Sequence, residues 1–220
     1  MMSAPARFAL IALLLLVAGA CGLLGGSANT IDVLLIRDGI AARALSSLPT
    51  TFGLILNIVG GVAATIGLMV IAALVLWRRH RSGDALRFVA FVLGGRVIVE
   101  ATKLFVHRAR PALDPHPVTT HSLSFPSAHA ANSMIVFCAL ALIFASRSTR
   151  RFWILAAITA SLIIGASRSL LGVHWPSDVV AGWAIGGAWL LLWWPVIERL
   201  AANQAQHDIV GRHRPARHED

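Results

Sequence analysis

Three clusters of polar residues interrupt an otherwise apolar chain, and together they supply the groups needed for phosphoryl transfer. Cations can hold the phosphate oxygens, two histidines can attack phosphorus and move protons, and an aspartate can orient one histidine. This set of groups is complete without a metal ion. The clusters are Lys103 with Arg110-Pro111, then Pro126-Ser127-Ala128-His129, and finally Ser167-Arg168 with His174 and Asp178.

The first cluster follows a helical spacing. Lys103, His107 and Arg110 are four and three residues apart, so on a helix they lie on one face over about two turns. Pro111 is expected to end this helix, where the side chains converge on an anion. For His107 and Arg108, extension of the side chain toward the lipid headgroups is an equal alternative. We therefore assign phosphate binding only to Lys103 and Arg110.

The second cluster has the features of a helix start. Pro126 suits the first turn of the long apolar helix that is expected to follow it. The free N–H groups and the positive dipole at such an end attract phosphate. Ser127 adds a hydroxyl, and His129 can protonate a leaving oxygen. By itself the cluster also fits an ordinary capped helix start with a histidine at the membrane edge.

The third cluster joins two apolar stretches. Arg168 is expected to close one of them, and His174 and Asp178 to open the next. A carboxylate one helical turn from an imidazole can accept its Nδ1 proton, which leaves Nε2 free for attack or proton transfer. A plain histidine–aspartate hydrogen bond at a helix start is the alternative. The presence of the other two clusters favours the catalytic interpretation.

The composition places the chain in a membrane. Of its 220 residues, 57% are hydrophobic and 13% are charged, whereas apolar residues make up about 45–50% of a soluble domain. The formal charge of +9 does not indicate nucleic-acid binding, because the basic residues lie in short runs without interleaved aromatic residues. Cys21 and Cys138 lie in apolar stretches and are expected to be small buried hydrophobes.

Apolar stretches of about 20 residues can cross a bilayer as helices. The sequence contains six such stretches, so we predict an all-α, polytopic membrane protein that forms one six-helix transmembrane bundle. The fourth and fifth stretches are short and are expected to borrow neighbouring residues. The predicted spans are residues 8–25, 54–77, 86–106, 130–146, 152–168 and 178–197.

The first stretch also has features of a cleaved signal peptide. Arg7 precedes it, and Ala18-Gly19-Ala20 stands before Cys21. Lipoprotein cleavage boxes favour a larger aliphatic residue where this chain has Ala18. We therefore interpret residues 1–25 as a retained transmembrane anchor.

The remaining chain divides into three segments. Residues 26–52 are expected to face outward, either as a short amphipathic helix on the membrane surface or as a packed loop. Residues 53–200 are expected to form the transmembrane bundle. Residues 201–220 are polar and rich in His and Arg, which predicts a disordered cytoplasmic tail.

The basic residues predict the orientation in the inner (plasma) membrane. They follow the second, fourth and sixth spans, and Lys and Arg accumulate in cytoplasmic loops, so both termini are expected to be cytoplasmic. The polar clusters then face the periplasm or exterior. Lys103 and Arg110 break the charge rule there, which favours a functional role. The basic residues assigned to the cytoplasmic side are Arg78, Arg79, Arg81, Arg87, Arg147, Arg150, Arg151, Arg199, Arg212, Arg214 and Arg217.

From about residue 80 to residue 197 the chain resembles the type 2 phosphatidic acid phosphatase family, whose core is related to vanadium haloperoxidases and bacterial class A acid phosphatases. The family's three motifs occur in order and with the family's internal spacing. Lys, six residues and Arg-Pro run from Lys103 to Pro111. Pro-Ser-Gly-His corresponds to residues 126–129, and Ser-Arg, five residues, His, three residues and Asp run from Ser167 to Asp178.

One residue departs from the family pattern. Ala128 stands where the family has glycine. A methyl group is strained at positive φ but nearly harmless in a helix. Because a helix is expected to begin here, we expect activity to survive.

The resemblance implies an integral membrane lipid phosphatase that needs no cofactor and no metal. His174 would attack phosphorus to form a phosphohistidine, Asp178 would orient it, and His129 would protonate the leaving group and later activate water. The phosphate would be held by Lys103, Arg110, Ser127, the backbone at Ala128, and Arg168.

The implied substrate is an amphiphile whose phosphate reaches the outer loops while its tail stays in the bilayer. Undecaprenyl diphosphate, phosphatidylglycerophosphate and phosphatidic acid all fit this description. Two alternatives stay open: a phosphotransferase that uses an acceptor other than water, and a non-catalytic relative that binds or transports lipid. The sequence has no heptad seam that indicates an oligomer, and Gly182, Gly186 and Gly187 are expected to allow close packing within the bundle.

Overall fold

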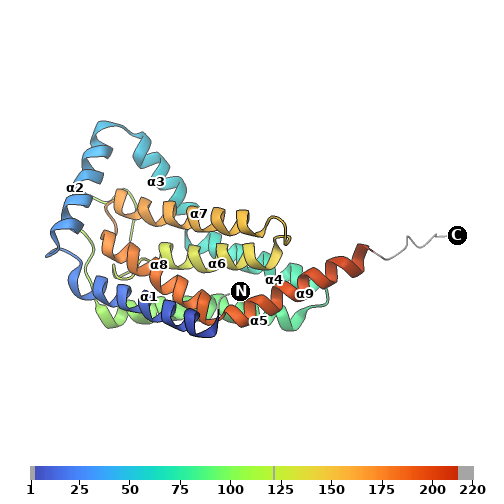
Figure 1. Cartoon of the computed structure of the whole chain (residues 1–220). Helices are drawn as coiled ribbons and strands as arrows, with labels where there is room; N and C mark the ends of the chain where they lie inside the picture. Colours follow the sequence, from blue (N-terminus) through green and yellow to red (C-terminus); the bar gives the residue numbers. More distant parts are fainter. Residues whose placement is uncertain (1–2, 121, 213–220) are drawn as a thin grey trace.

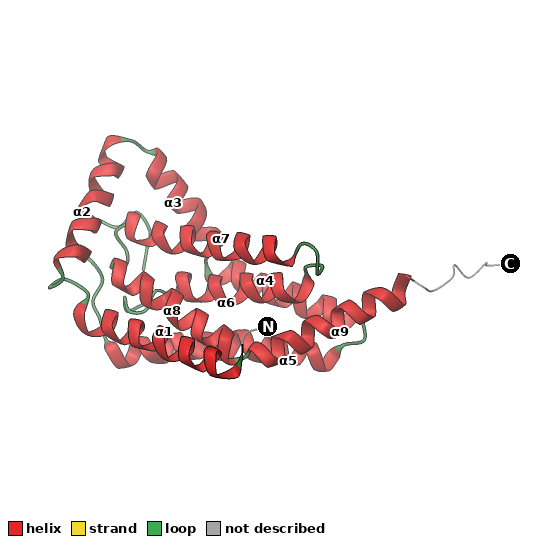
Figure 2. Cartoon of the chain, in the orientation of Figure 1, coloured by secondary structure: helices red, strands yellow, loops and turns green. Residues whose placement is uncertain are grey.

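A computed structural model describes residues 3–120 and 122–212, and within these residues the chain forms nine α-helices and no strand (Figure 2). The all-α prediction is therefore confirmed for the described part of the chain. The helices are α1 (Ala4–Leu24), α2 (Thr30–Leu45), α3 (Leu48–Val59), α4 (Val62–Arg78), α5 (Ser82–Val106), α6 (Ala128–Phe144), α7 (Arg150–Leu170), α8 (Pro176–Leu192) and α9 (Trp194–Arg212).

Helices α1 and α4–α8 lie side by side in a bundle (Figure 1). Helix α2 crosses one end of this bundle and contacts α7 and α8, and α3 then returns along α7. Helix α9 projects beyond the opposite end. The bundle therefore has one end that is covered by helical segments and one end from which the C-terminal helix emerges.

A closely packed apolar core fills the half of the bundle near α9. It lies between α4, α5, α6 and α9 and contains side chains that are fully buried. A smaller apolar cluster joins α1, α5, α6 and α8 nearer the other end. Burial of this kind fixes the helices relative to one another. The largest buried members of the first cluster are Leu76, Phe88, Phe91, Ile135, Ile143, Ile197 and Leu200.

Two glycines on α8 allow it to approach α6 closely. A Cβ atom at Gly182 would lie 2.6 Å from the Ser127 carbonyl oxygen, and one at Gly186 would lie 2.7 Å from the Ala131 carbonyl oxygen. Any side chain at these positions would push the two backbones apart. Gly187 is different, because its nearest neighbour would be Leu14 on α1 at an ordinary 3.5 Å. Close packing was thus correctly predicted for Gly182 and Gly186.

Two predicted spans are broken where the residues disfavour a continuous helix. The span 54–77 is divided between α3 and α4, because Gly60 ends the first helix and Gly61 precedes the second. The span 178–197 is divided between α8 and α9, which meet at 64°. Pro195 lies at this bend and has no N–H with which to continue the preceding helix. Each of these two predicted spans is therefore built from two helices.

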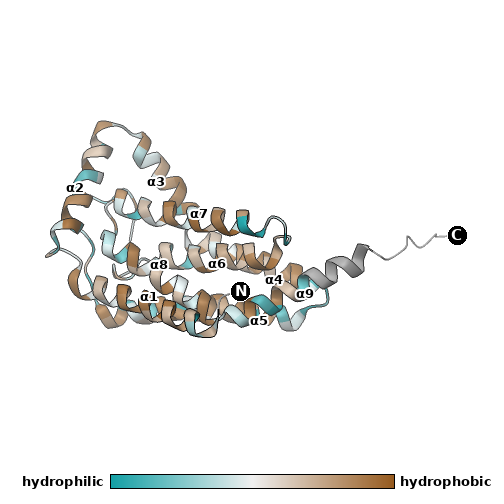
Figure 3. Ribbon diagram, viewed as in Figure 1, coloured by the Kyte–Doolittle hydropathy of each residue, from teal (hydrophilic) through white to brown (hydrophobic). Residues whose placement is uncertain are grey.

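By length and composition, three helical segments can cross a membrane: Ala4–Leu24, Leu48–Arg78 and Arg150–Leu170. A fourth is obtained if α8 and the first part of α9 are counted as one bent span. Helix α6 is apolar but only 17 residues long, and α5 carries several charged residues. The number of six spans therefore stays a prediction, although hydrophobic residues predominate along the helices of the bundle (Figure 3).

The segment boundaries also need correction. Residues 26–52 are largely helical, because α2 occupies most of them, and the boundary at residue 53 falls inside α3. The predicted disordered tail is wrong for residues 201–212, which continue α9. The start of α9 is held to α5, where Arg81 donates to the Leu200 carbonyl at 2.7 Å and Asn203 donates to Asp84 at 3.1 Å. Residues 213–220, which include Arg214 and Arg217, lie outside the described residues.

Candidate active site

The polar clusters meet at the end of the bundle that α2 crosses (Figure 1). Helices α5 and α7 end there, and α6 and α8 begin there, so loops that are far apart in the sequence become neighbours. Arg110 Nη1 lies 3.1 Å from His174 Nε2, and the Ser124 hydroxyl donates to Asp178. These contacts bring together the end of the first motif, the residues just before the second motif, and the third motif.

Lys103 and Arg110 reach this end from different kinds of backbone. Lys103 lies in the last turn of α5 and is 4% exposed, whereas Arg110 lies in the loop beyond the helix. The expected shared helical face was wrong, because His107 takes a left-handed conformation with φ 55° and turns the chain. Both cations nevertheless donate to the hydroxyl of Ser122, from Lys103 Nζ at 3.1 Å and from Arg110 Nη2 at 3.2 Å. Two cations that share one oxygen acceptor form a suitable place for a phosphate oxygen.

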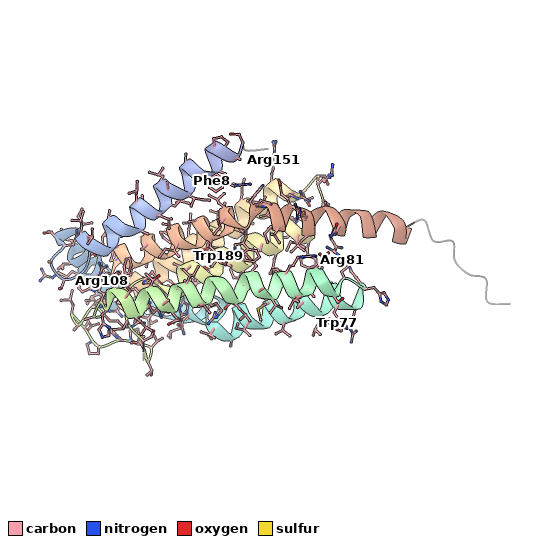
Figure 4. All side chains as sticks on the ribbon, turned by 90° about the horizontal axis from the view of Figure 1, so that it is seen from below. Phe8, Trp77, Arg81, Arg108, Arg151 and Trp189 are labelled. Atoms are coloured by element: carbon pink, nitrogen blue, oxygen red, sulfur yellow. The ribbon has the colours of Figure 1, made fainter. Side chains whose placement is uncertain are left out.

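His107 and Arg108, for which the sequence left two roles open, differ from each other. His107 is exposed. Arg108 turns inward, with Nη1 2.8 Å from Asp178 Oδ1 and Nη2 donating to the carbonyls of Cys21 and Gly22 at 2.8 and 2.7 Å. Figure 4 shows Arg108 beside the end of α1. Its guanidinium is thus engaged inside the protein and does not extend toward the headgroups.

The second motif forms the start of α6 and contains a hydroxyl that has no hydrogen-bond partner among the described residues. Ser127 is the N-cap residue, so Pro126 lies before the helix and not in its first turn as expected. The Ser127 N–H donates to the Asp178 carbonyl at 2.9 Å, but its buried Oγ has no partner among the described residues. Ala128 is the first helical residue and does not have positive φ. The conformation expected for Ala128 is therefore confirmed.

Asn57 on α3 contacts two of the predicted site residues. Its side-chain oxygen accepts from Arg168 Nη1 at 2.6 Å, and its backbone oxygen lies 3.2 Å from His129 Nε2. Because a carbonyl only accepts, His129 carries its proton on Nε2 in this arrangement. Arg168 is 2% exposed, and its Nε has no partner among the described residues. His129 is also within electrostatic range of Lys103 and His174.

His174 lies just before α8 and is 2% exposed. Arginine only donates hydrogen bonds, so the contact from Arg110 makes His174 Nε2 an acceptor and leaves the hydrogen on Nδ1. Nδ1 faces Asp178 Oδ2 at 3.6 Å and Ser124 Oγ at 3.4 Å, both longer than an ordinary hydrogen bond. Burial lowers the pKa of His174 to about 4. The imidazole is therefore neutral at physiological pH, which is the form that can act as a nucleophile.

Asp178 lies in the first turn of α8 and is completely buried. Its Oδ2 accepts from the Trp175 N–H at 3.0 Å and from the Ser124 hydroxyl, and its Oδ1 accepts from Arg108. Three donors keep the carboxylate in place beside His174. His174 itself precedes the helix, so the predicted pairing arises from a loop and a first turn and not from two positions on one helix.

Three polar residues of the site were not assigned from the sequence. Ser122 and Ser124 lie in a polar loop where no spacing distinguishes them, although Ser124 stands directly before the second motif. Asn57 carried a signal, because it is a polar side chain inside a predicted apolar span. Among the side chains that the structure describes, in residues 3–120 and 122–204, no group of three or more His, Cys, Asp or Glu is arranged to hold a metal ion.

The fold and the site define a helical membrane protein in which basic side chains surround a histidine–aspartate pair. Residues 84–202, more than half of the chain, match the PAP2 superfamily, and the protein belongs to that superfamily. The resemblance noted from the three motifs is thereby confirmed. The matched region contains every predicted site residue and begins after Asn57.

Several proteins of known sequence are similar to this one. The undecaprenyl-diphosphatase of Sulfolobus acidocaldarius is 32% identical over 129 residues, which cover 55% of this chain and 58% of the relative. The phosphatidylglycerophosphatase B of Bacillus subtilis is 30% identical over 125 residues, which cover 54% of this chain and 61% of the relative. The lipid A 1-phosphatase of Rhizobium etli is 32% identical over 114 residues, 48% of this chain and 46% of the relative. The chain thus spans roughly half to three fifths of the length of these relatives.

A solved structure supports the fold over nearly the whole chain. It is the crystal structure of a transmembrane PAP2-type phosphatidylglycerolphosphate phosphatase from Bacillus subtilis, with a TM-score of 0.69 and 23% identity. The similarity covers 94% of this chain and 98% of the other. The chain therefore has the fold of a multi-pass membrane protein of this superfamily.

Proposed function

We propose that this protein is an integral membrane phosphatase that hydrolyses a phosphomonoester or diphosphate of a lipid through a phosphohistidine intermediate. The observation that carries the proposal is the position of His174, which has Asp178 behind Nδ1 and Arg110 in front of Nε2. The relatives named above support the substrate class, because their names refer to phosphates of undecaprenol, phosphatidylglycerol and lipid A. Undecaprenyl diphosphate, phosphatidylglycerophosphate and phosphatidic acid remain the candidate substrates.

Phosphate binding is assigned to the groups that are cationic or unsatisfied at the end of the bundle. Lys103 and Arg110 exchange the Ser122 hydroxyl for phosphate oxygens. The free hydroxyl of Ser127 and the N–H groups at the start of α6, including that of Ala128, donate to the same anion. Arg168 adds its unpartnered Nε–H. These donors stabilise the charge that spreads over the equatorial oxygens in the transition state.

The first chemical step transfers the phosphoryl group to His174. The Nε2 lone pair attacks phosphorus while the bond from phosphorus to the lipid or leaving phosphate oxygen breaks. His129 acts in its imidazolium form: it gives one proton to that leaving oxygen and becomes neutral. Asp178 stabilises the positive charge that develops on the imidazole. Since Arg110 occupies Nε2 in the free protein, its guanidinium must turn toward the phosphate before the attack.

The second step returns the enzyme to its starting state. His129, now neutral, accepts a proton from water, and the water oxygen attacks phosphorus as the bond between phosphorus and Nε2 breaks. Inorganic phosphate leaves, and His174 regains its lone pair. No step in this sequence calls for a redox change or a cofactor.

The site is proposed to face the periplasm or exterior, with both termini in the cytoplasm. Arg81 and Arg151 lie at the end of the bundle opposite Arg108 (Figure 4), which supports this orientation because basic loops favour the cytoplasm. A lipid whose headgroup reaches the outer loops then keeps its tail in the bilayer.

Phosphate release from the purified protein tests the proposal. The protein in detergent is incubated with prenyl diphosphates and phospholipid phosphates, with and without a chelator. We expect release from at least one lipid, equally in both conditions, and a loss of at least about 10³-fold in His174→Ala. Full activity in that variant would contradict the mechanism. Size-exclusion chromatography of the variant shows whether the fold is retained.

Trapping of the intermediate separates hydrolysis from its alternatives. With labelled substrate quenched in base, we expect an acid-labile phosphoprotein that His174→Ala does not form. A lipid-binding or transport protein would form no covalent adduct. A phosphotransferase would form it but release little phosphate until an alcohol acceptor is added.

A further inference from the structure

Arg108 is a second strongly bonded cation beside the histidine–aspartate pair, and the first family motif leaves its position unspecified. Its Nη1 donates to Asp178 Oδ1 at 2.8 Å and to Ser177 Oγ at 3.1 Å. Its Nη2 donates to two backbone carbonyls in the last turn of α1, and its guanidinium lies 4.7 Å from the centre of the Phe125 ring. The side chain is about 10% exposed. Both terminal nitrogens of the guanidinium are thus bound by protein groups, and one of its faces packs on an aromatic ring.

The contact with Arg108 sets the orientation of the Asp178 carboxylate. Asp178 is completely buried, and an isolated carboxylate there would be expensive. Arg108 binds Oδ1, so the other oxygen, Oδ2, faces His174 and receives the Ser124 and Trp175 hydrogen bonds. Arg108 contacts the carboxylate with Nη1 alone, but its Nη2 is held by the carbonyls of Cys21 and Gly22, so the direction from which Oδ1 is bound is fixed by the planar guanidinium.

The same arginine connects the pair to α1. The carbonyls of Cys21 and Gly22 belong to the C-terminal turn of the helix, where unpaired carbonyls and the negative end of the dipole favour a cation. Asp32 continues this connection, because it accepts from the backbone N–H of Ser177 at 2.9 Å and from that of Gly26 at 2.6 Å. The start of α8 is therefore held on one side by residues that lie outside the matched family region.

The geometry points to Arg108 as a positioning residue that orients Asp178 toward His174 and ties this pair to the end of α1. This inference rests on the proposed phosphatase function. Arg108 lies on the Oδ1 side of Asp178, away from the Nε2 atom that would attack phosphorus. It therefore acts on the chemical step and not on phosphate binding.

Steady-state kinetics of a matched set of variants test the inference. We expect Arg108→Met to lower kcat about 10²-fold while KM changes less than about threefold, because a misoriented catalytic group affects the transition state. Arg108→Lys should recover at least about tenfold of this loss, since an ammonium can still reach the carboxylate. Arg37→Met is the control: Arg37 is an exposed arginine on α2, and kcat should be unchanged.

A double-mutant cycle distinguishes positioning from general support of the fold. In an Asp178→Asn background, Arg108→Met should lower kcat less than about threefold further, because there is no carboxylate left to orient. An equal loss in both backgrounds, or a rise in KM without a fall in kcat, would overturn the inference. If Arg108→Met does not survive purification, the same cycle with Arg108→Lys decides the question by the same criterion.

The controls also separate this inference from the proposed function. If the wild-type protein releases no phosphate from any lipid, the proposed function itself is wrong. If the wild-type protein is active and Asp178→Asn impairs it but Arg108→Met does not, only the positioning role of Arg108 is wrong.

Discussion

At the residue scale, the site of the free protein is held in a resting arrangement. Arg110 donates to the Nε2 atom of His174, which is the atom assigned to nucleophilic attack. Ser122 accepts from the cations that are assigned to phosphate. A phosphate anion offers both arginine and lysine better acceptors than a hydroxyl or a neutral imidazole. In the proposed mechanism, binding of the substrate would therefore draw Arg110 away from His174 and release the nucleophile.

The buried position of His174 predicts an unusual pH profile. A histidine in water has a pKa near 6.5, but burial lowers the pKa of His174 to about 4. Its neutral, nucleophilic form thus persists as the pH falls through 6.5 and is lost only near 4. Asp178, Arg110 and Arg168 are the charged groups that face it. We expect kcat/KM to lose activity on the acid side with a midpoint near 4 for this group.

The measurement is kcat/KM from pH 3.5 to 8 with a soluble phosphate ester. The ionisation of the substrate is determined separately by ³¹P NMR and removed from the profile, since a phosphate monoester ionises near pH 6. Chromatography at each pH confirms that the protein stays folded. An acid-side midpoint near 6.5 after this correction would contradict a buried, neutral His174.

The unpartnered hydroxyl of Ser127 leads to a second prediction at the residue scale. Because Ser127 Oγ has no partner among the described residues, Ser127→Ala removes no hydrogen bond from the free protein. We expect the variant to keep its Tm and to bind vanadate about tenfold more weakly, in line with about 1–1.5 kcal/mol for one hydrogen bond. Ser169→Ala is the control, because Ser169 Oγ is equally unpartnered but lies outside the assigned site. Unchanged vanadate inhibition in Ser127→Ala would exclude the hydroxyl from the phosphate pocket.

At the element scale, α3 completes the site although it lies outside the matched family region. Its Asn57 holds Arg168 with the side chain and His129 with the backbone. Helix α3 meets α4 at the glycine pair at residues 60–61 and packs along α7. The break in the predicted span therefore places a polar residue over the end of the bundle.

The variant Asn57→Ala tests this role of α3. Arg168 loses its side-chain acceptor and with it a fixed orientation, so we expect kcat/KM to fall about tenfold. Asn203→Ala is the matched control at the other end of the molecule, where Asn203 donates to Asp84. It should leave kcat/KM unchanged. Equal effects of the two substitutions would show that Asn57 supports only the fold.

The close approach of α6 and α8 predicts a sharp difference between two glycines. Gly182→Ala places a Cβ atom 2.6 Å from the Ser127 carbonyl oxygen and must move one helix. We expect a destabilisation of about 1–3 kcal/mol, together with reduced activity, because Ser127 also donates to the Asp178 backbone. Gly187→Ala should have little effect on Tm or activity, since its nearest contact is an ordinary 3.5 Å. Thermal unfolding in detergent compares them, and equal Tm values would contradict the packing argument.

The sequence predicted which side chains meet but not the backbone that carries them. Spacing identified Arg110 and His174 correctly as neighbours of the same pocket, yet it placed Arg110 on a helix that in fact ends at Val106. Hydropathy recognised apolar stretches but not the break at residues 60–61, because glycines in a run of apolar residues hardly change the average. The contacts of Asn57 and Arg108 depend on tertiary packing and have no local signal beyond their polarity.

At the scale of the whole molecule, the arginines assigned to the cytoplasmic side and the proposed active site lie at opposite ends of the bundle. Arg81 and Arg151 lie at one end, and Arg108 lies at the other with the assigned phosphate groups (Figure 4). If the arginine-rich end is cytoplasmic, the loop between α5 and α6 is outside the cell membrane. This arrangement gives a direct test of orientation.

Single cysteines in the two kinds of loop provide that test. In a background where Cys21 and Cys138 are replaced by alanine, Thr119→Cys lies in the loop near the site and Ser148→Cys lies in the loop between α6 and α7, both at exposed positions. With a maleimide that does not cross membranes, we expect labelling of Thr119→Cys in intact cells and of Ser148→Cys only after permeabilisation. The reverse pattern would show a cytoplasmic site.

The packed core beneath the pocket has a consequence for the direction in which lipid moves. The half of the bundle below the site is filled by buried apolar side chains such as Phe88, Phe91 and Ile135, which a charged headgroup would have to displace to pass through. A headgroup that enters at the outer rim has to exit there as well. If the site faces outward as proposed, the dephosphorylated lipid would stay in the leaflet from which it was taken, and its return to the opposite leaflet would depend on a separate translocation step.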